Sequence, residues 1–318
     1  MKRFLCRCIS VLLATAAIIW LGGQAYRHTS AWKNRIRDAE IAKYQTMPKQ
    51  IDTAVFGISH ALCAFLPQDY GENFFSFALS SQTPVYDWMQ MRQYADRIQP
   101  GATVVLVVSY IALFENQSED TEKSLQNNKY NRILSPWYIP HCDVDRWVLE
   151  RFSPLLTDSL GDVVKAFVDP PELSGDIALA WQTSLQAEDL EREQNRIHQN
   201  QYQMLADAPL EGEPNMLNAY ENMIEMCRSR QWNPVLVTVP YLHAYEQCLP
   251  KKTIPAYREI VAGLSEKYGV PWLDYSTNEV FHENMALFKD IDHLNWAGAA
   301  QLAELFCRDA AQLGLAVD

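Results

Sequence analysis

This chain lacks the features that mark several large classes of protein. Lysine and arginine form no cluster, and the net charge is -12 at pH 7 with a pI near 5.1. Nucleic acid is therefore excluded as an expected partner, because binding to phosphates depends on basic clusters. No repeat, low-complexity tract or glycine-rich phosphate loop occurs either. With 318 residues, 48% of them hydrophobic, the chain is long and apolar enough to bury a large core.

Metal-ligand motifs are missing as well: no HxxxH, HxH or CxxC spacing occurs. The histidines considered as ligands are His141, His198, His243 and His282. The cysteines beyond the first residues are Cys63, Cys142, Cys227, Cys248 and Cys307. We therefore expect no metal and no cofactor.

Cys227 and Cys248 are the best candidates for a disulfide, because we expect the segments that carry them to be neighbours. Alternatively, all these cysteines are buried small side chains.

The N-terminus carries an uncharged apolar stretch. Three basic residues precede it, and it extends from Cys8 to about Tyr26, close to the roughly 20 residues that a spanning helix needs. We expect residues 1–30 to be a signal anchor, with the positive flank in the cytoplasm and the C-terminal domain extracytoplasmic. Gly23 and Ala25 make signal cleavage and secretion the alternative. The membrane is therefore an expected partner.

Residues 31–49 are polar and predict a stalk, and residues 50–318 predict one α/β domain. In that domain, five short apolar runs alternate with helical patterns, as in a parallel sheet covered on both faces. The expected strands are Thr53–Phe56, Phe74–Leu79, Thr103–Val108, Val235–Val239 and Val270–Leu273. The expected helices are Ala61–Leu66, Pro84–Ile98, Asn215–Arg230, Thr253–Lys267 and Ala297–Leu313. This order predicts a three-layer αβα sandwich around a flavodoxin-like, five-stranded parallel sheet.

The stretch at about 114–210 does not fit the alternation of strands and helices. Residues 115–130 are polar and predict an exposed loop, residues 132–167 predict packed helices, and the charges at 188–193 predict a solvated helical face. We interpret the stretch as a mostly helical insertion after the third strand. Ligands of open α/β sheets bind at that strand edge, so we expect the insertion to form a lid or substrate wall.

Two motifs far apart in the chain supply the groups of serine-based catalysis. Gly57 and Ser59 follow the first apolar run, which predicts a strand that turns sharply and presents a hydroxyl at its C-terminal edge. Near the C-terminus, Asp290 stands three residues before His293. A serine hydroxyl needs an imidazole to accept its proton and a carboxylate to orient that imidazole. The alternative is a serine that only caps a helix and a structural histidine.

These motifs resemble those of the SGNH, or GDSL-like, hydrolase superfamily. Phe56-Gly57-Ile58-Ser59-His60 is similar to its first motif and Asp290-Ile291-Asp292-His293 to its last. The longer run from Phe288 to Ala299 is also similar to anchored, exported members that act on cell-envelope glycans, including acetyl and D-alanyl transfer proteins. The resemblance spans about residues 51–313, and its specific part is the two end motifs.

The resemblance implies that Ser59 attacks an ester carbonyl, that His293 acts as general base and then as acid, and that Asp290 fixes the tautomer of the imidazole. Asp292 competes with Asp290 for the last role. His60 is expected to be a packed or capping histidine, with the role of base as its alternative.

The oxyanion hole is where the sequence departs from the superfamily. Its usual donors include a glycine after the second strand and an asparagine after the third, and this chain has neither. The candidates are the backbone N–H groups of Ser59 and of Ser80 or Ser81, with side chains from Gln82 or Ser109. Alternatively, residues 80–82 only cap the helix that follows.

The resemblance implies an extracytoplasmic serine esterase or O-acyltransferase. Its substrate would be an acylated envelope polysaccharide, carrying acetyl or D-alanyl esters, or a small acyl ester. The alternative is a catalytically weak envelope protein that binds glycan or another partner in the same cleft.

Overall fold

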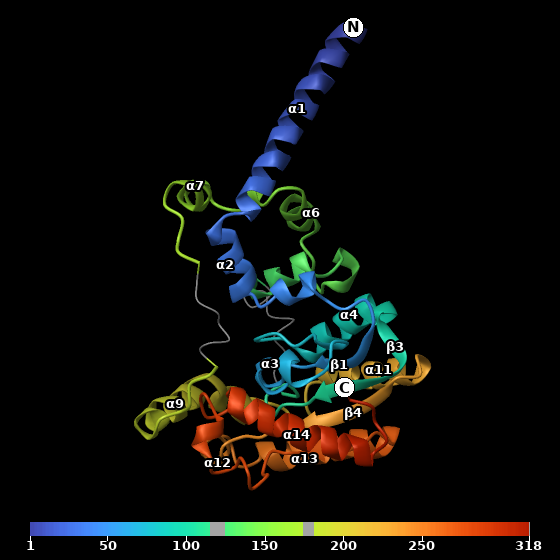
Figure 1. The fold of residues 1–318 in the computed structure, drawn as a ribbon, viewed down its shortest axis with the longest axis vertical. Helices are drawn as coiled ribbons and strands as arrows, with labels where there is room; N and C mark the ends of the chain where they lie inside the picture. The colour runs from blue at the N-terminus through green and yellow to red at the C-terminus, as the bar shows by residue number, and fades with distance from the viewer. Residues whose placement is uncertain (115–124, 174–180, 318) are drawn as a thin grey trace. The chain divides into compact units, whose positions relative to one another are not determined.

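The computed structural model describes residues 1–114, 125–173 and 181–317 (Figure 1). The chain divides into two compact units. The N-terminal unit comprises Met1–Gln45 and Gln126–Ile177, and the sheet unit comprises Thr46–Leu125 and Ala178–Asp318. The expected loop at 115–130 lies mostly outside the described residues. The expected stalk and insertion boundaries remain predictions.

Among its described residues, the N-terminal unit contains one helix that is long and apolar enough to cross a membrane, α1 (Lys2–Arg27). Its described part also contains α2 (Ser30–Asp38), α6 (Val144–Phe152) and α7 (Leu160–Val168), with short 3-10 turns at 42–45, 125–132, 136–138 and 154–156. Tyr26, Trp32 and Ala166 form a small buried cluster. The side chain of Ser153 donates to the carbonyl of Ile19 at 2.9 Å, which ties the turn after α6 to the last part of α1.

The sheet unit is built on five parallel strands in the order β2-β1-β3-β4-β5. The strands are β1 (Ile51–Phe56), β2 (Phe74–Ser76), β3 (Ile98–Val107), β4 (Asn233–Thr238) and β5 (Trp272–Asp274). The predicted α/β class and five-stranded parallel sheet are confirmed. The strand interiors read as near-continuous apolar runs because both faces of the sheet are covered.

Helices follow each strand of the sheet unit. In the described part of the unit they are α3 (Ser59–Ala64), α4 (Pro84–Tyr94), α9 (Leu190–Ile197), α10 (Gln203–Asp207), α11 (Pro214–Ser229), α12 (His243–Gln247), α13 (Thr253–Tyr268) and α14 (Trp296–Gln312), with a π-helical turn at 198–202. Helix α3 packs against α14, and α4 packs against α11. The chain passes from β1 to its neighbour β2 on one side, and then back to β3 on the other side of β1. Because such crossovers are right-handed, this reversal places α3 and α4 on opposite faces of the sheet.

Several expected boundaries differ from the structure. The second strand ends at Ser76 rather than at Leu79. The helix expected to run to Ile98 ends at Tyr94, and Ile98 already belongs to β3. Pro100 and Gly101 lie inside β3, where the pairing with β1 shifts register between Ile51 and Thr53. The strand therefore accommodates both residues at an irregularity, because the missing N–H of a proline is tolerated there.

Candidate active site

Ser59 is presented by a tight turn at the C-terminal end of β1. Gly57 has φ +150°, and a Cβ at this position would lie 2.8 Å from the Cβ of Ala61. The N–H of Gly57 donates to the buried carboxylate of Asp87 at 2.9 Å, and its carbonyl accepts from the amide of Gln82 at 3.1 Å. Both peptide groups of the turn are therefore fixed. As a result, Ser59 becomes the first residue of α3.

His293 lies in the loop that leads into α14. The carboxylate of Asp290 accepts the backbone N–H groups of Asp292 at 3.1 Å and of His293 at 2.8 Å, which folds the loop around that carboxylate. The N–H of Lys289 donates to the carbonyl of His293 at 3.0 Å. Asn295 caps α14 by accepting the N–H of Gly298 at 3.0 Å.

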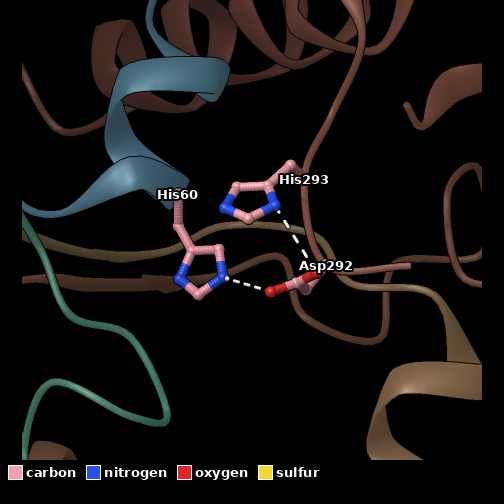
Figure 2. A group of neighbouring side chains, drawn as sticks. All are labelled: His60, Asp292 and His293. Atoms are coloured by element: carbon pink, nitrogen blue, oxygen red, sulfur yellow. Dashed lines mark hydrogen bonds and ion pairs between the residues drawn. The ribbon is translucent and has the colours of Figure 1, made fainter. Parts of the chain in front are cut away.

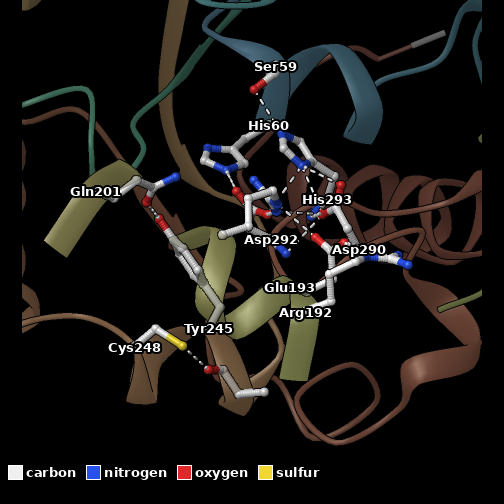
Figure 3. A network of polar contacts seen from close by, with 12 residues as sticks. Ser59, His60, Arg192, Glu193, Gln201, Tyr245, Cys248, Asp290, Asp292 and His293 are labelled. Atoms are coloured by element: carbon white, nitrogen blue, oxygen red, sulfur yellow. Dashed lines mark hydrogen bonds and ion pairs between the residues drawn. The ribbon is translucent and has the colours of Figure 1, made fainter. Parts of the chain in front are cut away.

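The two motifs meet in three dimensions (Figure 3). Ser59 Oγ lies 2.8 Å from His293 Nε2, and His293 Nδ1 lies 2.9 Å from Asp290 Oδ1. In the neutral ring, Nδ1–H donates to the carboxylate and leaves Nε2 to accept the serine proton. All three predicted catalytic residues are thus brought into one hydrogen-bonded chain. This is the geometry that activates a serine hydroxyl.

A second imidazole lies beside the first (Figure 2). His60 Nε2 is 3.3 Å from Asp292 Oδ2, and both side chains are 2% exposed. The rings of His60 and His293 are 4.8 Å apart, and Asp292 Oδ1 is 3.4 Å from His293 Nδ1. His60 therefore contacts Asp292 and the ring of His293, as a packed histidine does. In the described part of the chain, Ser59 Oγ has His293 Nε2 as its imidazole partner, so the contacts of His60 are not those of a base.

Arg196 of α9 provides the positive charge in this cluster. Its guanidinium donates to Asp292 at 2.6 Å and to Glu193 at 2.7 Å, and it lies 3.9 Å from Asp290. The charged stretch 188–193 was expected to be a solvated helical face. Glu193 is instead buried, and it holds Arg196 against the histidine loop.

The surrounding charges shift the pKa values of the buried groups. Burial alone would lower the pKa of His293, but the carboxylates of Asp290 and Asp292 raise it well above its ordinary value. Burial would raise the pKa of Asp292, yet its contacts with His293 and His60 hold it well below its ordinary value. For His60, burial dominates and lowers the pKa.

A cavity of about 190 Å³ opens over Ser59. Its walls come from the ends of β1 and β2, the segment after β3, the π-helical turn and the histidine loop. The lining residues are Ile58, Ser59, His60, Ser81, Gln82, Thr83, Pro84, Ile111, Ala112, Arg196, Gln201, Asp292 and His293. Arg196 and Gln201 belong to the stretch expected to form a substrate wall.

The four oxyanion candidates lie in different surroundings. Ser81 lines the cavity with φ +52°, in the left-handed region. Gln82 also lines it, but its amide nitrogen donates to the carbonyls of Gly57 and Phe77, and so it holds the turn. Ser109 is fully buried and is not among the lining residues. Ser80 directly precedes the cavity wall. Of the four, Ser81 is the best placed to face a bound substrate.

His60, Asp292 and His293 also offer two imidazoles and a carboxylate within 4.8 Å of one another, which is a possible metal-ligand set. Their partners argue against a metal. Arg196 already contacts Asp292, and a guanidinium repels a divalent cation. Both ring nitrogens of His293 have partners, Ser59 and Asp290. The hydrogen-bonded chain accounts for this set better than an ion does.

The remaining predicted residues are separated from this cavity. Cys227 is buried in α11, Cys248 donates to the carbonyl of Ala244, and all seven cysteines are free, so the considered disulfide is not formed. Arg196, by contrast, lines the cavity and contacts Asp292. No periodic pattern in the sequence marks this position, because Arg196 belongs to α9, a short helix that continues into a π-helical turn.

Comparisons with known proteins add little to this geometry. No model of a protein family matches the chain, and no curated protein matches it. Among solved structures, the chain is similar to one described as a "putative acylhydrolase" from Bacteroides fragilis. The two share 12% sequence identity over 90% of this chain and 99% of that chain, with a TM-score of 0.41.

Proposed function

We propose that this chain is a serine esterase or O-acyltransferase. Ser59 is the nucleophile, His293 is the general base and then the general acid, and Asp290 orients the ring. The observation that carries the proposal is the continuous chain from Ser59 Oγ through His293 to Asp290, with contacts of 2.8 and 2.9 Å. These contacts lie within the range that proton transfer requires.

In the first step, Ser59 Oγ bonds to the acyl carbon and its proton moves to His293 Nε2. Collapse of the tetrahedral intermediate then breaks the bond to the alcohol, which leaves with the proton from His293. Water or a sugar hydroxyl takes up the acyl group in a second step that uses the same base. The backbone N–H of Ser59 and the segment at Ser81 are the proposed stabilisers of the oxyanion.

The substrate we propose is a small acyl ester on a cell-envelope polysaccharide. A cavity of about 190 Å³ is smaller than the roughly 300–1,000 Å³ of pockets for drug-sized ligands, which favours acyl groups the size of acetyl or D-alanyl. Helix α1 is long and apolar enough to anchor the chain in a membrane. Because positive residues precede it, we propose that the sheet unit lies outside the cytoplasm.

The test uses the full-length protein in detergent with an aryl acetate as substrate. Ser59→Ala and His293→Ala should each lower kcat/KM by about 10³-fold or more. His198→Ala and Ser229→Ala, at exposed positions, are the matched controls and should retain wild-type rates. Equal hydrolysis by wild type, Ser59→Ala and His293→Ala would show that the assignment is wrong.

One observation favours a second candidate, a catalytically weak protein that binds glycan in the same cavity. Gln82 is committed to the turn at Gly57, and Ser109 is buried outside the cavity, so neither adds an oxyanion donor there. A fluorophosphonate probe separates the two candidates, because it reacts with an activated serine. Labelling of the wild type that disappears in Ser59→Ala supports the enzyme, and an unlabelled wild type supports the binding protein.

A further inference from the structure

Two histidines that are far apart in the chain face each other outside the candidate active site. His243 is the first residue of α12, and His282 lies in the turns that follow β5. Their ring centroids are 4.9 Å apart, and the backbone N–H of His243 donates to the carbonyl of His282 at 2.8 Å. The fold therefore fixes the two rings together at a position that sequence spacing does not reveal.

Carboxylates complete this histidine cluster. The ligand atoms of His243, His282 and Glu283 all lie within 4.8 Å of one another. Glu246, one turn after His243 on α12, places its Oε2 3.3 Å from His282 Nε2. The side chains of His282 and Glu246 are 22% and 13% exposed, so both are held in partly dry surroundings.

The surroundings of the cluster are those of metal ligands. Tyr110 donates its hydroxyl to Glu246 Oε1 at 2.8 Å, which leaves the other oxygen toward His282. Such outer hydrogen bonds orient metal ligands. Among the described residues, His243 Nδ1 is buried without a hydrogen-bond partner. Two imidazoles and one carboxylate suit a borderline divalent ion such as Zn²⁺ better than Mg²⁺, which prefers oxygen ligands.

We propose that His243, His282 and Glu283 bind a divalent transition-metal ion of the Zn²⁺ type, with Glu246 as the hydrogen-bonded carboxylate that orients His282. The ion would join the start of α12 to the turns at 278–284. Neither histidine lines the cavity over Ser59, and the proposal does not depend on the proposed esterase activity. Three protein ligands leave one position of a four-coordinate ion for water.

The test is calorimetric titration of the full-length protein, stripped by a chelator and kept in detergent, with Zn²⁺ and separately with Mg²⁺. We expect one Zn²⁺ per chain and a far weaker response to Mg²⁺. His243→Ala and His282→Ala should each weaken Zn²⁺ binding at least about tenfold, and Tyr110→Phe about tenfold through the loss of its hydrogen bond to Glu246. Co²⁺ should give the visible absorption bands of a four-coordinate ion in the wild type and lose them in His243→Ala and His282→Ala.

Two controls keep the result specific. His198→Ala removes an exposed histidine elsewhere, and His60→Ala removes the imidazole beside His293; both should bind Zn²⁺ like the wild type. Circular dichroism verifies the fold of each variant, and His282→Asn replaces His282→Ala if the latter unfolds. The proposal is overturned if the wild type takes up no Zn²⁺, if both cluster variants bind it unchanged, or if only His60→Ala loses it.

Discussion

Asp292 precedes His293 in the chain and also contacts its ring: Asp292 Oδ1 lies 3.4 Å from His293 Nδ1. Asp290 Oδ1 reaches the same nitrogen at 2.9 Å. One imidazole N–H therefore faces two carboxylates in a buried site. Asp292 Oδ1 also accepts a hydrogen bond from Arg196 at 2.6 Å, while Asp292 Oδ2 faces His60. We therefore expect Asp290 to orient the ring and Asp292 to act on it electrostatically.

The pH dependence of activity should reflect both carboxylates. Because Asp290 and Asp292 outweigh burial and raise the pKa of His293 well above its ordinary value of 6.5, the imidazolium persists to higher pH. Only the neutral ring can accept the serine proton. We expect kcat/KM for an aryl acetate to rise with pH, with its half-maximum above 6.5. If kcat/KM instead reaches its half-maximum at or below pH 6.5, the pKa of His293 is not raised.

Stability should show the opposite trend in the same pH range. Above pH 6.5, the unfolded chain loses the His293 proton while the folded chain keeps it until the raised pKa is reached. The folded state then binds more protons, so its free energy of unfolding falls as pH rises through this window. Urea titrations of the wild type and of His293→Gln should diverge below the raised pKa and converge above it.

Substitutions separate the roles of the two carboxylates. Asp290→Asn should lower kcat roughly 10³- to 10⁴-fold, because the ring loses the acceptor that fixes its tautomer. Asp292→Asn should keep a larger share of kcat and move the acidic limb to lower pH, since one negative charge beside His293 is removed. Measuring kcat as a function of pH for both variants tests these two expectations. The reverse ranking of their kcat values would assign the orienting role to Asp292.

Arg196 should contribute to stability through the charge that it balances. Arg196→Met leaves the 2%-exposed Asp292 without its guanidinium. Breaking a fully buried pair costs about 3–5 kcal/mol. Because Arg196 is 35% exposed and partly screened by solvent, we expect a loss of about 1–2 kcal/mol. The control Arg192→Met removes a 70%-exposed arginine and should change the urea midpoint little. Equal losses in both variants would refute the role assigned to Arg196.

The sheet and the hydrogen-bonded chain were predictable because each depends on a local signal. Apolar runs marked the strands, and Gly57, Ser59 and the Asp290-to-His293 spacing marked the loops at their ends. The clusters formed by side chains from several elements were not predictable. Arg196 reaches Asp292 from a segment without periodicity, and His243 meets His282 only because β4 and β5 are neighbours in the sheet. Motifs defined by residue spacing detect only residues that are close in the sequence, so they do not detect such pairs.

The turn at Gly57 should be the backbone position most sensitive to substitution. Gly57→Ala adds a Cβ at φ +150°, 2.8 Å from Ala61 and 3.0 Å from the Cβ of Val107. Strain and overpacking together predict a loss of about 2–4 kcal/mol, and displacement of Ser59 should abolish fluorophosphonate labelling. Gly263→Ala is the matched control. It lies within α13 with nothing within 4 Å of the added Cβ, so it should stabilise the chain by about 0.5–1 kcal/mol. Thermal unfolding and labelling of both variants provide the test, and a Gly57→Ala protein that is as stable and reactive as the wild type would mean that the turn does not position the serine.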